Sequence, residues 1–109
     1  MTSPPVIPRE LAQRDIDDAI AHYQAEGGQA LALRLIDALQ QGFQRVGRHP
    51  GVGSPRYAHE LGLEGLRVWP LRCFPLLVFY QEQSDHIDVW RVLHAQRDIP
   101  SWMQIPDTP

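Results

Sequence analysis

Residues 65–100 constrain the fold of this chain more than any other stretch, because they carry the pattern of three consecutive β-strands. The central run, Phe74–Tyr80, is apolar on both alternating faces, which is typical of a strand covered on two sides. It ends in strong strand-forming residues, and the polar cluster Gln81–Asp85 after it predicts a turn. We therefore expect a small antiparallel β-meander with this run at its centre.

The outer strands of the meander are predicted at residues 66–71 and 86–94. Pro70 cannot donate a ladder hydrogen bond, so the first of them is expected at an edge or at a bulge. In the second, one set of alternating positions holds Ile87, Val89 and Leu93, and the other holds Trp90 and Val92. Both faces of this strand are therefore expected to pack against apolar groups.

Two amphipathic helices joined by glycines are predicted upstream of the meander. The first begins near Arg9 or Glu10 and ends at Glu26-Gly27-Gly28, and its apolar face is Ala12, Ile16, Ala19, Ile20 and Tyr23. The second runs from about Gln29 to Arg48, and its buried stripe is Ala32, Leu35, Ile36, Leu39, Phe43 and Val46. Leu33 lies off this stripe, so we expect it either to be exposed or to lie under a partner. The two helices are expected to form a hairpin across one face of the sheet.

The remaining segments complete an α+β fold in the order strand, helix hairpin, three strands and a short C-terminal turn. Residues 4–8 can form a brief extended segment, which their prolines restrict to an edge. Residues 49–65 are rich in glycine and proline and are expected to be loop. Asp98 is expected to cap the terminal turn, and the last residues are expected to form a frayed tail.

Length and composition indicate one folded domain, residues 1–109, with a core of about residues 6–102. The chain is 43% apolar and 21% charged, as in an ordinary globular protein. The single cysteine, Cys73, excludes an internal disulfide and fits a reducing compartment. No secretory signal and no membrane-spanning run is recognisable, so a cytoplasmic location is expected.

Charge is unevenly distributed along the chain. The net charge of −3 argues against a dedicated nucleic-acid binder, so direct DNA binding is not expected. Residues 34–72 nevertheless hold six arginines against three carboxylates, and the chain contains no lysine. Guanidinium groups suit bidentate pairing with carboxylate or phosphate, although a high-GC genome, which favours arginine codons, explains the same bias.

Five short motifs, in order, resemble the ParE branch of the RelE/ParE family of bacterial type II toxins. They span roughly residues 6–102 and are Ala12-Gln-Arg-Asp15-Ile16 with Tyr23, His49-Pro50 with Gly53, Gly65-Leu66-Arg67, Phe79-Tyr80, and Val92-Leu93-His94-Ala95-Gln96-Arg97-Asp98. The resemblance implies a helix hairpin packed on a twisted antiparallel sheet. It also implies a toxin that inhibits DNA gyrase by binding, arrests growth, and is neutralised by a ParD-like antitoxin, with which a hetero-oligomer is expected.

The resemblance leaves two alternatives open. RelE-like members of the family cleave messenger RNA on the ribosome, which requires a cluster of groups that exchange protons and stabilise charge. If this chain is such a metal-independent ribonuclease, the candidate catalytic residues are Arg67, Arg72, His94 and Arg97. A non-toxic member that only retains antitoxin binding is the other alternative. The absence of lysine, and of tyrosine after Tyr80, favours the non-catalytic branch.

The candidate contact residues for target or antitoxin are Leu33, Arg67, Arg72, Arg91, Arg97 and Trp102. For Arg67, a salt bridge with Glu64 or Glu82 is an equally good interpretation. His94 is expected to be a packed, hydrogen-bonded histidine rather than a base. Trp102 is a candidate interface anchor.

No cofactor or metal is expected. The five histidines lack the close spacing of metal ligands, and one cysteine cannot build a structural zinc site. Cys73 lies among apolar residues in the sequence, where a thiol is usually inert.

Overall fold

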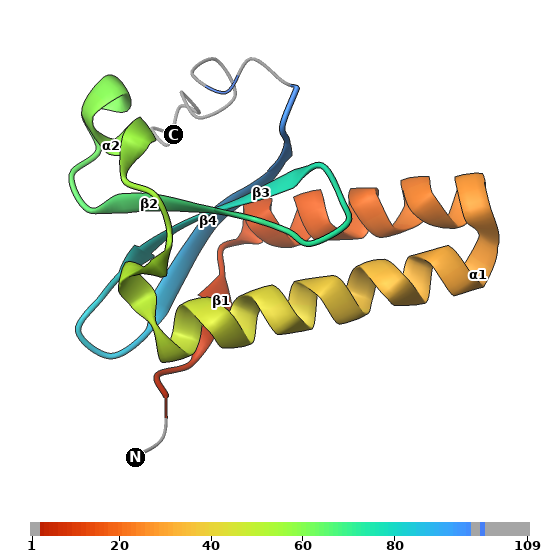
Figure 1. Ribbon diagram of the computed structural model, residues 1–109, viewed down its shortest axis with the longest axis horizontal. Helices are drawn as coiled ribbons and strands as arrows, with labels where there is room; N and C mark the ends of the chain where they lie inside the picture. Colours follow the sequence, from red (N-terminus) through yellow and green to blue (C-terminus); the bar gives the residue numbers. More distant parts are fainter. Residues whose placement is uncertain (1–2, 97–98, 100–109) are drawn as a thin grey trace.

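The structure, a computed structural model, describes residues 3–96 and residue 99. Its elements are β1 (Val6–Pro8), α1 (Glu10–Arg48), the 3-10 helix η1 (Pro50–Val52), α2 (Arg56–Leu61), β2 (Leu66–Pro70), β3 (Leu76–Glu82) and β4 (Ile87–His94). They form the predicted α+β fold, in which a long helical hairpin lies against a four-stranded sheet (Figure 1). No helix in the described part of the chain is both long enough and apolar enough to cross a membrane.

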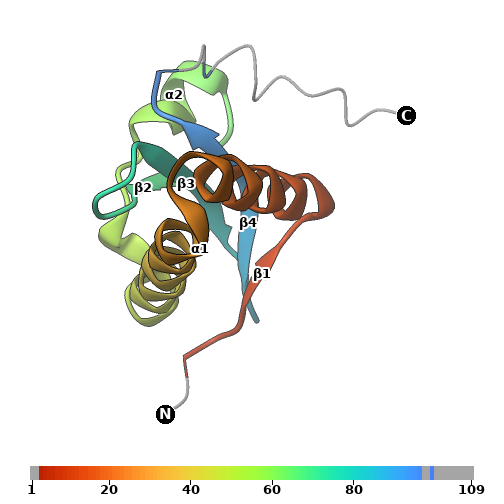
Figure 2. The same cartoon turned by 90° about the vertical axis from the view of Figure 1, so that its right-hand side faces the viewer.

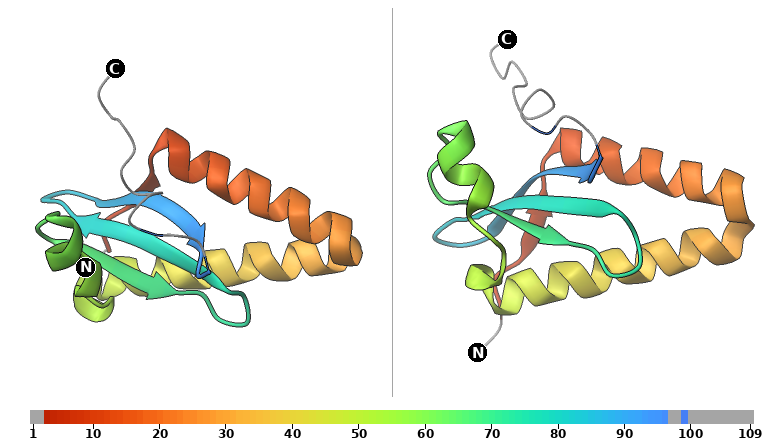
Figure 3. Two further views of the ribbon diagram at one scale, coloured as in Figure 1. Left: turned by 90° about the horizontal axis from the view of Figure 1, so that it is seen from above. Right: turned by 45° about the horizontal axis from the view of Figure 1, so that its top comes forward.

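The hairpin is α1 itself, which is broken at Gly28. This residue has φ 78° and ψ −171°, a backbone conformation that is essentially restricted to glycine. We call residues 10–27 the first arm and residues 29–48 the second arm. Figure 2, which looks from the tip of the hairpin toward the sheet, shows the two arms, and Figures 1 and 3 show the tip extending past the sheet. The two predicted helices and their glycine junction are confirmed.

The sheet has the strand order β1-β4-β3-β2. β2, β3 and β4 pair antiparallel, as the meander predicts. β1 pairs parallel to β4 at the edge of the sheet, so the sheet is mixed rather than entirely antiparallel. The amino-acid pattern of β1 does not indicate whether its partner strand runs parallel or antiparallel, and the parallel pairing was not predicted.

A β-bulge in β4 changes which residues share a face. Tyr80 is opposite Val89 and Phe79 is opposite Arg91, so Trp90 is the extra residue. Ile87, Val89 and Val92 all pack in the core under the hairpin, whereas Trp90 and Leu93 pack on the opposite face of the sheet. The predicted grouping of Leu93 with Ile87 and Val89 is therefore wrong beyond the bulge.

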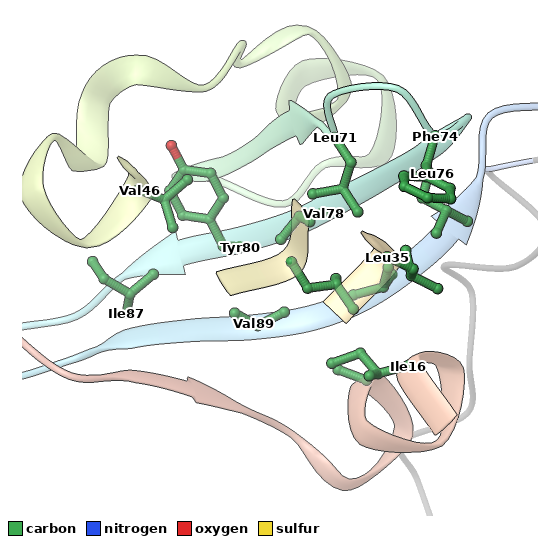
Figure 4. Packing of buried hydrophobic residues seen from close by; sticks show 13 residues of the cluster. Ile16, Leu35, Val46, Leu71, Phe74, Leu76, Val78, Tyr80, Ile87 and Val89 are labelled. Carbon is green, nitrogen blue, oxygen red and sulfur yellow. The ribbon is translucent and has the colours of Figure 1, made fainter. Parts of the chain in front are cut away.

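Two apolar cores lie on the two faces of the sheet. The core under the hairpin includes Ile16, Leu35, Val46, Leu71, Phe74, Leu76, Val78, Tyr80, Ile87 and Val89 (Figure 4). The core on the opposite face is formed by Leu66, Val68, Leu77, Phe79, Leu93 and Ile99. Residues 76–80 of β3 are all buried because they contribute alternately to the two cores, which confirms that this strand is covered on both sides.

The segment predicted as loop, residues 49–65, contains η1 and α2. Helix α2 turns Tyr57, Ala58 and Leu61 toward the second core. Gly62 ends it in the left-handed conformation, with φ 66°. The glycines and prolines of this segment mark the boundaries of short helices rather than irregular structure. The predicted cap Asp98 and the predicted tail lie outside the described residues. Most of the predicted C-terminal turn lies outside them as well.

Candidate partner-binding surface

A groove runs along the second arm of α1, between that arm and the strand β2 with the turn that follows it. It consists of two hollows of about 310 and 560 Å³ that share Ala38, Gln41 and Arg72. We call it the second-arm groove; its lining is Leu33, Arg34, Asp37, Ala38, Gln41, Gly42, Arg45, Trp69, Pro70, Leu71, Arg72, Cys73 and Phe74.

Helical spacing produces one wall of the groove. Arg34, Ala38, Gln41 and Arg45 recur at i, i+4, i+7 and i+11, which places them along one side of the second arm. Gly42 is buried beside them, and a Cβ at this position would lie 2.9 Å from the Leu71 side chain. The glycine thus allows the sheet to approach the helix closely. The apolar floor of the groove, formed by Trp69, Leu71 and Phe74, is therefore continuous with the core.

Three cations surround this floor. Arg34, Arg45 and Arg72 are exposed, and none of them forms an ion pair with a carboxylate in the described residues. The nearby Asp37 accepts a hydrogen bond from Gln41, with 2.9 Å between Nε2 and Oδ2. The groove is therefore an apolar surface with excess positive charge, on a chain whose net charge is −3.

Leu33 and Arg72, predicted separately as contact residues, line the same hollow of this groove. Leu33 is 55% exposed, the highest value among the exposed large apolar side chains in the described part of the chain. Cys73 is also exposed here, with φ 67°, so the thiol is not enclosed by the apolar residues that flank it in the sequence. The sequence around Cys73 is apolar because the neighbouring residues, and not the thiol itself, enter the core.

Arg67 lies elsewhere and holds a loop. Its guanidinium donates hydrogen bonds to the carbonyl oxygens of Gly53 at 2.7 Å and Gly51 at 3.3 Å. The anticipated salt bridge with Glu64 or Glu82 is not formed. One terminal nitrogen of Arg67, Nη1, is therefore engaged by its own chain.

Tyr80 binds the same loop from the next strand. Its hydroxyl donates to the carbonyl of Pro50 at 2.6 Å and accepts the Gly53 N–H at 2.9 Å. Burial raises the pKa of Tyr80 above 10.0, with smaller opposing effects from the Gly53 N–H and from Arg67. A Cβ on Gly53 would lie 2.6 Å from the hydroxyl oxygen, so glycine is required at this contact.

Arg91 is 6% exposed and forms a bidentate ion pair with Asp15 of the first arm. Nε lies 2.7 Å from Oδ2 and Nη2 lies 2.8 Å from Oδ1. The backbone N–H of Val92 also donates to Asp15, at 3.0 Å. The guanidinium of Arg91 thus joins the first arm to β4. A contact with a target or antitoxin would require this group to be exposed, and it is buried.

His94 lines a different groove, of about 460 Å³, between the first arm and the end of β4. Its Nδ1 accepts the backbone N–H of Gln96 at 3.1 Å, in agreement with a hydrogen-bonded histidine. His22 lies across this groove and pairs with Glu26 at 3.0 Å. No group of three or more metal-ligating side chains is found among residues 3–96 and 99.

The three ribonuclease candidates within residues 3–96 do not converge. Arg67 lies at the start of β2, Arg72 lies in the turn two residues after the end of this strand, and His94 lies in the groove of the first arm. Arg97 and Trp102 lie outside the described residues.

Sequence reasoning missed the other residues of the second-arm groove. Arg34 and Arg45 were counted only as part of the arginine-rich block, although their spacing of eleven residues places them on one helix side. Trp69 was not assigned to a groove. The role of Asp15 as an ion-pair partner required the fold, because Arg91 is 76 positions away.

Comparison with known proteins gives one matching family and a solved structure of similar fold. Residues 6–99 match the family model described as "ParE toxin of type II toxin-antitoxin system, parDE". A solved chain described as "Chromosomal ParDE TA system from P. aeruginosa" is similar in fold, with a TM-score of 0.72 and 18% identity over 86% of this chain and 98% of that one. No curated protein sequence matches significantly.

Proposed function

Because the chain belongs to the ParE toxin family of type II toxin–antitoxin systems, we propose that it is the toxin of such a pair and that a ParD-like antitoxin neutralises it. We further propose that it inhibits DNA gyrase by binding, in the cytoplasm and without catalysis. The observation that carries this proposal is the family match over residues 6–99, and the fold agrees with it.

The geometry of the surface favours binding over RNA cleavage. Phosphodiester cleavage without a metal requires a base, an acid and cations around one phosphate. Of the four residues that would supply these groups, Arg67 is bonded to loop carbonyls, and Arg72 lies in the turn beyond the other end of β2. By contrast, the second-arm groove combines an apolar floor with arginines that have no ion-pair partner in the described residues, which is a composition suited to a protein partner.

Two assays on antitoxin-free protein test the proposal together. Gyrase supercoiling is followed on relaxed plasmid, and messenger RNA integrity is followed in a translating extract. We expect supercoiling to stop while the RNA stays intact, and we expect the antitoxin to restore supercoiling. Cleaved RNA with normal supercoiling would replace this proposal with the ribosome-dependent nuclease. No effect in either assay, with antitoxin binding retained, would identify a non-toxic member.

A further inference from the structure

We propose that the groove between the first arm of α1 and the end of β4 binds an extended, cationic segment of the target protein. We call it the first-arm groove; its lining is Asp15, Asp18, Ala19, His22, Tyr23, Leu76, Val92, Leu93, His94 and Gln96. This inference rests on the proposed function above and assigns a place and a mode to the contact with the target. Three features carry it: an apolar floor, an open piece of sheet edge, and a carboxylate without an ion-pair partner in the described residues.

The floor of the first-arm groove is apolar. The groove has a volume of about 460 Å³ and lies where β4 ends beside the first arm (Figure 3). Ala19 and Tyr23 of the arm, together with Leu76 and Val92 of the sheet, supply the apolar surface. All four belong to the core under the hairpin or pack against it, and the Tyr23 ring meets Phe74 edge-on, with 5.1 Å between ring centroids. The floor is therefore held in place by the core.

The sheet edge beside this floor is open at the end of β4, because β1 pairs with only the first part of that strand. Farther along this edge, the N–H of Val92 donates to Asp15 at 3.0 Å, whereas the N–H of Ala95 donates to Pro75 on the opposite side. Since backbone groups alternate sides along a strand, the N–H and C=O of His94 face away from β3, as the N–H of Val92 does. Neither group of His94 is hydrogen-bonded to another group in the described residues.

These two backbone groups favour an extended occupant. An extended segment in the groove can pair with the N–H and C=O of His94, as a strand added to a sheet does. A helix bonds its own backbone groups and would leave both of these unpaired. The imidazole offers a further contact: its Nδ1 accepts the N–H of Gln96 at 3.1 Å, so in the neutral ring Nε2 carries the hydrogen and is a donor.

Charge selects a cationic side chain on this segment. Asp15 is neutralised by its ion pair with Arg91, and Glu26 lies 3.0 Å from His22. Asp18 is exposed, lines the groove and has no hydrogen-bond or ion-pair partner in the described residues. A lysine or arginine of the occupant would pair with this carboxylate at the rim of the apolar floor.

The proposed target has the chemistry that this groove requires. An enzyme that acts on DNA presents lysine and arginine to the phosphate backbone, so its surface carries cationic segments. The second-arm groove does not suit such a segment, because Arg34, Arg45 and Arg72 surround it. A nucleic acid does not suit the first-arm groove, because its phosphates would be repelled by Asp18.

The test compares two neighbouring carboxylates of the first arm. Asp18→Arg reverses the charge in the groove. Asp17→Arg is the matched control, because Asp17 is exposed on the same arm, lies outside the groove lining and makes the same change in net charge. Inhibition of purified gyrase is titrated with each toxin on relaxed plasmid, and the affinity for the antitoxin is measured in parallel by calorimetry. Thermal unfolding of each variant confirms that it folds.

A second pair of variants tests the open piece of sheet edge. His94→Ala removes the imidazole and keeps the backbone N–H, whereas His94→Pro removes both. Because this N–H faces away from β3, proline costs no ladder hydrogen bond within the sheet. The difference in gyrase inhibition between these two variants measures the backbone contact.

We expect half-inhibition of gyrase to require at least about tenfold more Asp18→Arg toxin than wild type, and Asp17→Arg to stay within about twofold. We also expect His94→Pro to inhibit at least about threefold more weakly than His94→Ala.

Inhibition by Asp18→Arg that equals wild type, or equal losses in Asp18→Arg and Asp17→Arg, would overturn the inference and leave the proposed function intact. Equal inhibition by the two His94 variants would also overturn it, because the occupant would then make no backbone contact with β4. Weaker antitoxin binding by Asp18→Arg, with gyrase inhibition unchanged, would assign the groove to the antitoxin instead. If wild type does not inhibit gyrase at all, the proposed function fails as well.

Discussion

The ion pair between Asp15 and Arg91 provides the most quantitative prediction, Asp15→Ala. The side chains are 13% and 8% exposed, so the pair is largely removed from water. The carboxylate accepts two hydrogen bonds from the guanidinium and one from the N–H of Val92. Alanine at this position withdraws all three acceptor contacts at once.

Removing one partner of a buried pair costs about 3–5 kcal/mol, because the remaining charge stays in a region of low dielectric. We expect about 3 kcal/mol, at the lower end, because Asp15 retains some solvent contact and Arg91 has further interactions. A domain of this size loses about 4–8 °C per kcal/mol, so the midpoint of thermal unfolding should fall by more than about 10 °C.

The assay is urea unfolding followed by circular dichroism. Asp18→Ala, on the exposed side of the same arm, is the control and should change the free energy of unfolding by less than about 0.5 kcal/mol. The double variant Asp15→Leu with Arg91→Met removes both charges and should recover much of the loss. An Asp15→Ala variant within about 1 kcal/mol of wild type would refute the conclusion that this pair joins the first arm to β4.

Three further predictions concern the loop held by Tyr80 and the turn of the hairpin. Gly53→Ala should lower the free energy of unfolding by about 1–3 kcal/mol, because its Cβ meets the phenol, whereas Gly51→Ala, which has no atom within 4 Å of its Cβ, should unfold close to wild type in the same urea titration. Raising the pH above 10.0 should destabilise wild type more than Tyr80→Phe. The folded state binds the phenolic proton more tightly than the unfolded state, so the free energy of unfolding falls as the pH rises through the raised pKa of Tyr80. Chemical unfolding from pH 8 to 11 tests this, and an equal dependence of stability on pH in the two proteins would contradict it. Gly28→Ala should cost about 1–3 kcal/mol, since an L-residue is strained at φ 78° and ψ −171°, and an unchanged thermal midpoint would mean that the hairpin bends in another way.

Local patterns predicted the elements of the fold that depend on periodicity. The apolar spacing of the two arms and the unbroken apolar run of β3 each had one structural interpretation, and both were confirmed. The parallel pairing of β1 and the bulge at Trp90 depend on partners distant in sequence, which periodicity does not encode. Helix α2 was missed because Pro55 and Gly62 were interpreted as loop signals, although they flank its six residues.

The functions of the arginines were the hardest to predict. The sequence does not distinguish the roles of Arg67, Arg72 and Arg91. In the structure Arg67 donates to loop carbonyls, Arg72 lines a groove, and Arg91 is buried in an ion pair with Asp15. Their burial and partners are set by tertiary contacts, so composition indicated the abundance of guanidinium groups but not their assignment. Leu33 was the informative exception, because its departure from the buried stripe correctly marked it as exposed.

The most direct test of the central claim is gyrase supercoiling with purified toxin, titrated with its antitoxin. We expect the toxin alone to stop supercoiling, and we expect a stoichiometric amount of antitoxin to restore it. Supercoiling that proceeds normally at saturating toxin would contradict the claim that this chain acts on gyrase.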